Sequence, residues 1–393
     1  MCKRTIVSES VTNGHPDKIA DWIADSILEE YSRKDRKVRA GIEVMVKDNV
    51  VVLGGEINSN AIVDYDTIVR DVFRRLSFPA SHHLEPENIK IVNLIGKQSE
   101  EIHSGVDKSD DVIGAGDQGF VCGFATNETP AYLGLGHYIS KKICRYIEKE
   151  EGLGPDAKSQ VVVEYDDEGN AEIKSVLIST MHNGIFDDLE ETRQYVSSAF
   201  YNNLMNIDAD IFEKHINGKK VPLTVNPCGA WHIGGPVSDC GVTGRKIVVD
   251  QFGGYSKVGG GSLSGKEMTK VDRSGAYMAR YLAKNIVASG ISNTAKVELS
   301  YMIGVPEPSS IYVSLEDNCD LEDAVIDIIK NNVDLTPAGI IKRFGYCEDR
   351  YEAIGRFGHY GVVESDCNSV ARCYELYPWE KTDIKKLFSK LKR

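Results

Sequence analysis

The chain has 393 residues and a formal net charge of −13 at pH 7, from 46 Lys and Arg against 59 Asp and Glu. This length allows two or three cooperating domains around a sizeable core. The negative charge argues against nucleic acid as a partner, because phosphate backbones bind basic faces, although a local basic cluster can still bind a small anion.

The first residues and the cysteines predict where the protein works. Lys3 and Arg4 are not followed by the apolar stretch of a secretory signal. No apolar run approaches the roughly 20 residues that span a bilayer. The nine cysteines are dispersed without a CxxC pair, which favours a reducing compartment. We therefore expect a cytoplasmic protein with no membrane partner.

Helix and strand patterns alternate along the chain. The first helix is predicted over residues 16–31, because Pro16 suits the first helical position and Ile19, Ile23 and Ile27 recur at four-residue spacing. The later elements are strands over 38–46, 50–53, 89–94, 160–165, 171–179, 296–303 and 310–315, and helices over 64–76, 132–150, 189–203, 274–289 and 321–332. Hairpins mixed with helices favour an α+β fold over a doubly wound parallel sheet. The domains that we expect cover residues 1–100, 113–232 and 233–393.

Residues 96–119 and 250–273 are predicted to be long loops, which are often functional in compact domains. In the second, Gly260 to Lys266 matches most of a P-loop pattern, but Glu267 stands where that motif needs Ser or Thr. A P-loop fold is therefore disfavoured. A glycine loop beside a lysine still exposes backbone N–H groups that favour phosphate. The alternative is a mobile surface loop.

Charges of both signs surround this loop. They are the cations Arg245, Lys246, Lys257, Lys266, Lys270 and Arg273, and the acids Asp239, Asp250, Glu267 and Asp272. Arg and Lys suit phosphoryl oxygens, and carboxylates suit Mg²⁺. The pattern therefore predicts a site for a polyphosphate with divalent cations, while a solvated charged face is the alternative.

A second motif, Gly14 to Lys18, opens the first helix. His15 and Asp17 lie where the helix dipole and unpaired N–H groups favour an anion. The alternative is that Asp17 only complements the helix dipole and that His15 is structural.

Together these segments resemble the S-adenosylmethionine synthetase family over almost the whole chain. The matching motifs are Ser8–Val11, Gly14–Lys18, Gly54–Glu56, Gly96–Ser99, Gly114–Gly119, Pro155–Gln160, Asp239–Gly241, Thr243–Lys246, Gly259–Lys266, Lys270–Ser274 and Pro378–Asp383. The resemblance implies three similar βαββαβ domains in a pseudo-threefold arrangement, with the active site at a dimer interface. The expected assembly is a homodimer or a dimer of dimers.

The resemblance also implies the reaction. ATP and L-methionine are the expected substrates, and the methionine sulfur attacks C5′ of ATP to release triphosphate, which is then hydrolysed to pyrophosphate and phosphate. The leaving group gains negative charge, so preorganised cations and Mg²⁺ should stabilise it. A covalent enzyme intermediate and a general base are not required.

The resemblance assigns roles to individual residues. The catalytic set is His15, Lys158, Arg245, Lys246, Lys266 and Lys270. The ATP-binding set is His15, Asp156, Lys158, Trp231, Asp239, Arg245, Lys246, Ser262 and Lys266. The methionine-binding set is Glu56, Gln98, Asp117, Asp239 and Lys270. The expected cofactors are two Mg²⁺ ions per site at Asp17 and Asp272, and K⁺ at Glu43.

The chain departs from the family pattern beside the expected nucleotide base. Ala230 and Trp231 stand where the family usually has Arg and Phe. The glycine loop has Val258, Ser262, Leu263 and Glu267 where His, Ala, Phe and Asp are common. The competing interpretations are a catalytically silent homologue with a binding or regulatory role and an ordinary P-loop kinase. Product analysis separates them.

Overall fold

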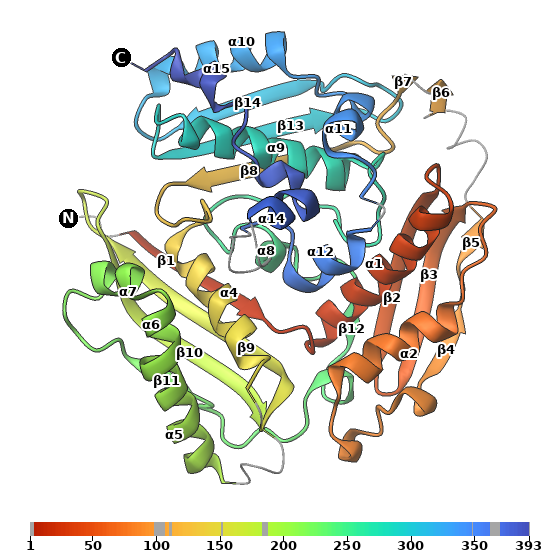
Figure 1. The fold of residues 1–393 in the computed structure, drawn as a ribbon, viewed down its shortest axis with the longest axis vertical. Coiled ribbons are helices and arrows are strands. Elements are labelled where there is room, and N and C mark those ends of the chain that lie inside the picture. The colour runs from red at the N-terminus through yellow and green to blue at the C-terminus, as the bar shows by residue number, and fades with distance from the viewer. Residues whose placement is uncertain are drawn as a thin grey trace.

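Three β-sheets, each backed by helices, surround the centre of the molecule (Figure 1). The structure is a computed structural model, and it describes residues 4–97, 107–109, 112–150, 152–182, 188–347, 349–361 and 370–392. None of the helices in these ranges is long and apolar enough to cross a membrane.

Sheet I has the strand order β12-β2-β3-β4, and β5 also pairs with β3. Its strands are β2 (Arg39–Lys47), β3 (Val50–Asn58), β4 (Lys90–Asn93), β5 (Gly96–Lys97) and β12 (Gly241–Val242). Helix α1 (Pro16–Lys34) packs on β2 and against α2 (Tyr65–Leu76). The strands alternate buried and exposed residues, as expected for a sheet with one covered face.

Sheet II has the order β1-β9-β10-β11. Its strands are β1 (Arg4–Val11), β9 (Leu153–Tyr165), β10 (Ala171–His182) and β11 (Leu223–Val225). Helix α4 (Leu135–Ile147) packs on β1 and β9. The remaining helical segments here are α5 (Leu189–Ala199), the π-helical turn η3 (Phe200–Leu204), α6 (Met205–Ile207) and α7 (Ala209–His215).

Sheet III has the order β14-β13-β8. Its strands are β8 (Gly119–Thr126), β13 (Thr294–Tyr301) and β14 (Ser310–Leu315), and α9 (Val271–Ala288) packs on β8 and β13. The other helices after β12 are α8 (Ile247–Asp250), α10 (Glu322–Asn332), α11 (Pro337–Phe344), α12 (Tyr351–Phe357), α14 (Val370–Leu376) and α15 (Lys385–Ser389). Of these, α12 packs on α1. A small ladder joins β6 (Asp107–Ser109) to β7 (Val112–Ile113). Short 3₁₀ turns are η1 (Ala80–His82), η2 (Pro86–Asn88), η4 (Gly235–Val237), η5 (Cys319–Leu321) and η6 (Pro378–Glu380).

The three sheets are linked by a cyclic exchange of strands. Strand β1 precedes α1, which packs on sheet I, yet β1 pairs with β9 of sheet II. Strand β8 precedes α4 of sheet II but pairs with β13 of sheet III. Strand β12 precedes α9 of sheet III but pairs with β2 of sheet I. Each sheet therefore repeats one plan, in which a donated strand lies beside a hairpin covered by a helix.

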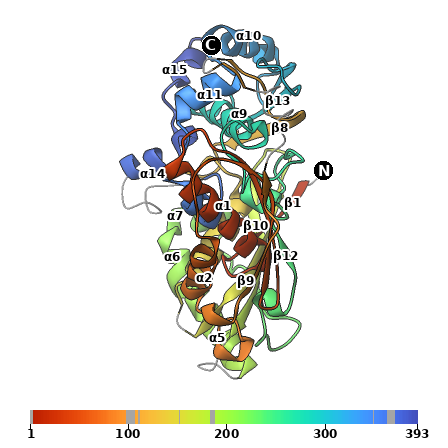
Figure 2. The same ribbon diagram turned by 90° about the vertical axis from the view of Figure 1, so that its right-hand side faces the viewer.

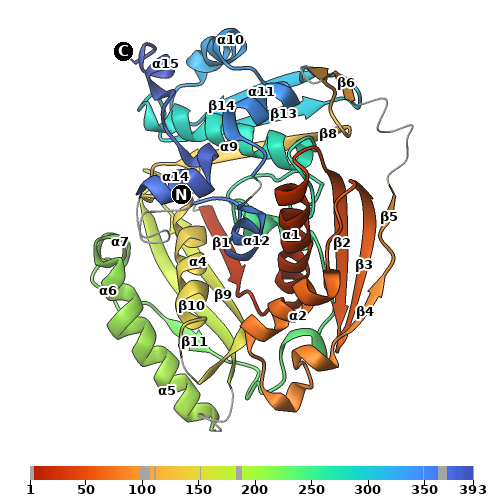
Figure 3. The ribbon, with the colours of Figure 1, turned by 45° about the vertical axis from the view of Figure 1, so that its right-hand side comes forward.

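This exchange makes three connections cross from one sheet to the next. They are residues 12–15, 127–134 and 243–270. The helices lie mainly on one side of the molecule, so strands such as β1 and β12 are open on the other (Figure 2). Figure 3 shows α1 lying along β2 and α4 along β9. Two of the crossing connections carry the motifs at His15 and in the glycine loop.

The predicted α+β fold is confirmed, and each predicted helix and strand overlaps an observed element. Strands β1, β8 and β12 were not predicted. Strand β9 begins at Leu153, seven residues before the predicted 160, so it carries Asp156 and Lys158. The predicted loop over 250–273 ends earlier, because α9 begins at Val271.

Candidate active site

His15 lies in the connection that follows β1 and is the N-cap residue of α1. Its backbone is extended, and its Nδ1 accepts a hydrogen bond from the Asp17 backbone N–H at 3.2 Å. An acceptor at Nδ1 leaves the proton of a neutral imidazole on Nε2. Burial, followed by the charges of Lys246 and Lys158, lowers the pKa of His15 to about 3. His15 is therefore a neutral N–H donor at physiological pH.

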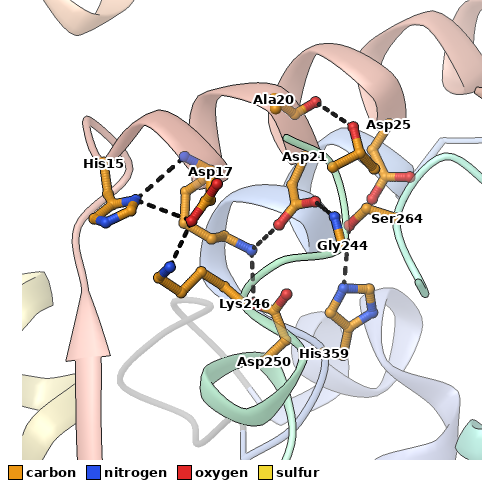
Figure 4. A network of polar contacts seen from close by, with 12 residues as sticks. His15, Asp17, Ala20, Asp21, Asp25, Gly244, Lys246, Asp250, Ser264 and His359 are labelled. Carbon is orange, nitrogen blue, oxygen red and sulfur yellow. Dashed lines mark hydrogen bonds and ion pairs between the residues drawn. The ribbon is translucent and has the colours of Figure 1, made fainter. Parts of the chain in front are cut away.

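Asp17 is the point at which several cations and donors converge (Figure 4). The Val242 backbone N–H donates to its Oδ1 at 2.9 Å, Lys246 Nζ contacts Oδ2, and Arg245 Nη1 lies 3.8 Å from Oδ1. Burial by itself would raise the pKa of Asp17, but the bonds from Lys246 and Val242 outweigh it and lower the pKa. The carboxylate stays ionised at neutral pH.

Asp156 and Lys158 approach the same place from β9. Asp156 is 2% exposed and accepts from the Gly235 backbone N–H at 2.7 Å. Its Oδ1 has no hydrogen-bond partner among the described residues, and burial raises its pKa to about 6. Lys158 and Asp239 are exposed, and their charges act on both His15 and Asp156. The His15 cluster is the set His15, Asp17, Asp156, Lys158, Asp239, Arg245 and Lys246.

The glycine loop forms a second cluster at the start of α9. Lys266 Nζ contacts Asp272 Oδ2, and Lys270 Nζ donates to Glu267 Oε1 at 2.9 Å. A Cβ at Gly261 would lie 2.3 Å from Asp272 Cγ, so a larger residue here would displace the Asp272 carboxylate from its present position. Glu267 is fully buried and bonded to Thr269 and Lys270, which makes it a structural residue of the loop.

A cavity of about 310 Å³ opens beside this loop against sheet I. Its lining includes Glu43, Glu56, Ser262, Lys266 and Lys270. Two carboxylates and two ammonium groups can pair with both ends of a small zwitterion. The loop cluster is the set Glu43, Glu56, Ser262, Lys266, Lys270 and Asp272.

Three further predicted residues, Asp117, Trp231 and Gln98, are not assigned to either cluster. Asp117 is exposed, and its Oδ1 accepts from the Gln118 N–H at 2.8 Å. The half-buried Trp231 donates from Nε1 to the Ile233 carbonyl at 2.8 Å. Gln98 lies outside the described residues.

The His15 cluster and the loop cluster are neighbours but remain separate. A Cβ at Gly244 would lie 2.5 Å from Ser262 Cβ, so the turn before Arg245 passes close to Ser262 of the loop cluster. Among the described residues, no hydrogen bond or ion pair joins the two clusters. The described part of the chain also holds no group of three or more His, Cys, Asp or Glu that could bind a metal by itself.

The sequence analysis missed the residues that support both clusters. Asp21 and Asp25 of α1 are buried, and they accept hydrogen bonds from the backbones of Gly244 and Gly265. Asp17, Asp21 and Asp25 recur every four residues on one buried face of the helix. This spacing could have indicated their role, because buried acids need hydrogen-bond or charge partners.

Comparison with known proteins identifies the family. The S-adenosylmethionine synthetase N-terminal, central and C-terminal domain families match residues 3–100, 112–231 and 233–369. An S-adenosylmethionine synthase of Brachyspira hyodysenteriae is 39% identical over 405 residues, with 98% of each chain covered. One of Mesoplasma florum is 37% identical, covering 99% of this chain and all of the relative.

A solved structure has the same fold over its full length. It is described as the structure of an unusual S-adenosylmethionine synthetase from Campylobacter jejuni. The TM-score is 0.85 at 32% identity, and the match covers 99% of this chain and 100% of the other. The chain therefore belongs to the S-adenosylmethionine synthetase family.

Proposed function

We propose that the chain transfers the adenosyl group of ATP to the sulfur of L-methionine. A sulfur lone pair forms the S–C5′ bond while the C5′–O5′ bond breaks, and the electron pair leaves on triphosphate. Hydrolysis of triphosphate to pyrophosphate and phosphate follows. The observation that carries this proposal is the convergence of Arg245 and Lys246 on the Asp17 carboxylate, next to the buried His15.

The His15 cluster suits a polyphosphate that gains charge. Lys246 and Arg245 supply fixed positive charge, and Nε2–H of His15 supplies a neutral donor. Donors fixed in place before the reaction stabilise developing charge without reorganisation. The same logic applies to Lys266, which contacts Asp272 in the loop cluster.

The carboxylates fit the expected cations. Mg²⁺ is usually held by one or two carboxylates together with substrate phosphates. The ionised Asp17 and the Lys266-paired Asp272 would each offer such a carboxylate. When bound, Mg²⁺ would neutralise phosphate charge. Glu43, exposed on β2 beside the cavity, is the proposed K⁺ ligand.

The cavity beside sheet I is the proposed methionine subsite. Glu56 would bind the ammonium group and Lys270 the carboxylate, because both line the cavity. Gln98, Asp117 and Asp239 remain predicted members of this subsite. Asp156 and the half-buried Trp231 are the proposed contacts of the adenosine part.

We propose that two copies of the chain share each active site. Each chain carries two separate clusters, and pairing would bring the His15 cluster of one copy to the loop cluster of the other. The open faces of the three sheets carry Val7, Met45, Phe120 and Tyr312, which are 41–50% exposed. Apolar side chains of this size on a sheet face favour burial against a partner. Light scattering that finds an active monomer at assay concentration would overturn this pairing.

A cytoplasmic location is also proposed. The seven cysteines within the described residues form no disulfide, which suits a reducing compartment.

Product analysis tests the function. The protein is incubated with ATP, methionine, Mg²⁺ and K⁺, and the products are identified by mass spectrometry. The sulfonium product together with pyrophosphate and phosphate is expected. A phosphorylated acceptor would indicate a kinase, and no product would indicate a silent homologue.

A further inference from the structure

One face of α1 carries three buried carboxylates at four-residue spacing. Asp17, Asp21 and Asp25 are each at most 1% exposed, and residues four apart lie on the same face of a helix. Each carboxylate accepts a hydrogen bond from the backbone of residues 242–265. The donors are the N–H groups of Val242, Gly244 and Gly265, at 2.9, 2.9 and 2.8 Å.

Two of these donors belong to tight glycine turns. Gly244 has a φ of +77° and Gly265 a φ of +80°, a region that favours glycine. A Cβ at Gly265 would lie 2.0 Å from the Ile42 carbonyl oxygen. Each glycine directly precedes cations proposed to bind phosphate: Arg245 and Lys246 in one turn, Lys266 in the other.

Asp25 holds the Lys266 turn from both sides. Its Oδ1 accepts from the Gly265 N–H, and its two oxygens bind Arg273 at 2.6 and 3.1 Å. The same Arg273 Nη1 donates to the Lys266 carbonyl at 3.1 Å. The Ser264–Gly265 and Lys266–Glu267 peptide groups are thereby bonded to one buried ion pair.

Asp21 holds the other turn through one backbone bond. It accepts from the Gly244 N–H (Figure 4), and Lys18 Nζ lies 3.1 Å from its Oδ2. Lys18 also donates to Asp250 at 2.6 Å, so its charge keeps a partner without Asp21. The two turns are thus anchored to one rigid helix, one turn of that helix apart.

We propose that Asp21 and Asp25 are positioning residues, each of which fixes one of the two turns that carry the phosphate-binding cations. This inference rests on the proposed function of Arg245, Lys246 and Lys266. Displacing a group by about 1 Å can cost on the order of a hundredfold in rate. Each turn is bonded to a buried carboxylate of α1 before substrate binds.

The test measures the affinity of the full-length protein for inorganic triphosphate with Mg²⁺ by calorimetry, together with the thermal midpoint. Asp21→Ala removes the acceptor and leaves Lys18 paired with Asp250. We expect at least tenfold weaker triphosphate binding. Asp21→Asn restores an acceptor of the same size and should bind within threefold of the unmodified protein. Unchanged affinity in Asp21→Ala, or equal weakening in both variants, would overturn the proposal.

Asp25→Ala has a matched control in Glu380→Ala. Glu380 also forms a buried pair with an arginine of α9, Arg280, at 3.0 and 3.1 Å. Its other described partners are Lys284 and the Gly361 N–H, outside both turns. Both variants should lower the thermal midpoint, but only Asp25→Ala should weaken triphosphate binding tenfold. Equal affinities in the two variants would overturn the role of Asp25.

Lys246→Ala separates this inference from the proposed function. If Lys246→Ala binds triphosphate as tightly as the unmodified protein, the proposed phosphate site fails and the inference fails with it. If Lys246→Ala weakens binding and Asp21→Ala does not, the inference alone fails.

Discussion

Replacing His15 with Asn should remove part of the acid sensitivity of the fold. Asn at the helix N-cap keeps an acceptor for the Asp17 N–H but cannot take up a proton. The folded pKa of His15 is about 3, against an ordinary value of 6.5. Between these values the unfolded chain binds a proton that the folded chain does not. The contribution of His15 to the free energy of unfolding is therefore fully present above pH 6.5 and is lost as the pH falls toward 3.

The size of the effect follows from the pKa difference. One pKa unit is about 1.4 kcal/mol, so at pH 5 the unmodified protein should have lost about 2 kcal/mol through His15. The Asn variant should lose about 2 kcal/mol less between pH 7 and pH 5. The assay is urea unfolding at both pH values and one fixed protein concentration. The other buried histidines, such as His137 and His359, are present in both proteins and cancel. If both proteins lose the same free energy of unfolding between pH 7 and pH 5, the claim that His15 is neutral in the folded protein is refuted.

Three further predictions concern the leaving group, the metal and the nucleotide base. Lys266→Ala should lower kcat roughly 10²–10³-fold if it stabilises the leaving group, whereas Lys257→Ala, an exposed lysine that pairs with Glu298, should leave kcat unchanged. A tenfold or smaller effect would make Lys266 a solvated lysine. Asp17→Asn should raise the Mg²⁺ concentration needed for half-maximal activity, and an unchanged requirement would remove it as a ligand. Trp231 would bind the base mainly by stacking, which tolerates any base. The double change Ala230→Arg, Trp231→Phe should therefore raise the kcat/KM preference for ATP over GTP. The same preference in both proteins would mean that the two residues only compensate each other in packing.

Local sequence patterns predicted elements whose signal lies within a few residues. The helix expected over 16–31 is observed over Pro16–Lys34, because its apolar face repeats every four residues. Strand β1 was missed because Ser8 and Ser10 occupy its buried positions, so the usual apolar alternation is absent. Its partner β9 lies about 150 residues away, as in the pairing of Ser10 with Ser159. The cyclic exchange therefore depends on tertiary contacts that no local pattern encodes.

The candidate site was likewise predicted in part, in its local motifs but not in its tertiary contacts. Motifs predicted which residue types gather, including His15 with Asp17 and the glycine loop with Lys266. They could not predict that one chain separates these residues into two clusters, since that depends on how three sheets pack. Nor did they predict that Asp25 and Arg273 form a buried pair under the loop.

Isotope transfer from ATP labelled with ¹⁸O at the 5′ bridging oxygen tests the central claim most directly. The proposed attack on C5′ breaks the C5′–O5′ bond, so the label should appear in the inorganic phosphate products and be absent from the sulfonium product. An enzyme that instead activates the methionine carboxyl group would keep the label in a nucleoside monophosphate and release unlabelled pyrophosphate. Label retained on the nucleoside would contradict adenosyl transfer.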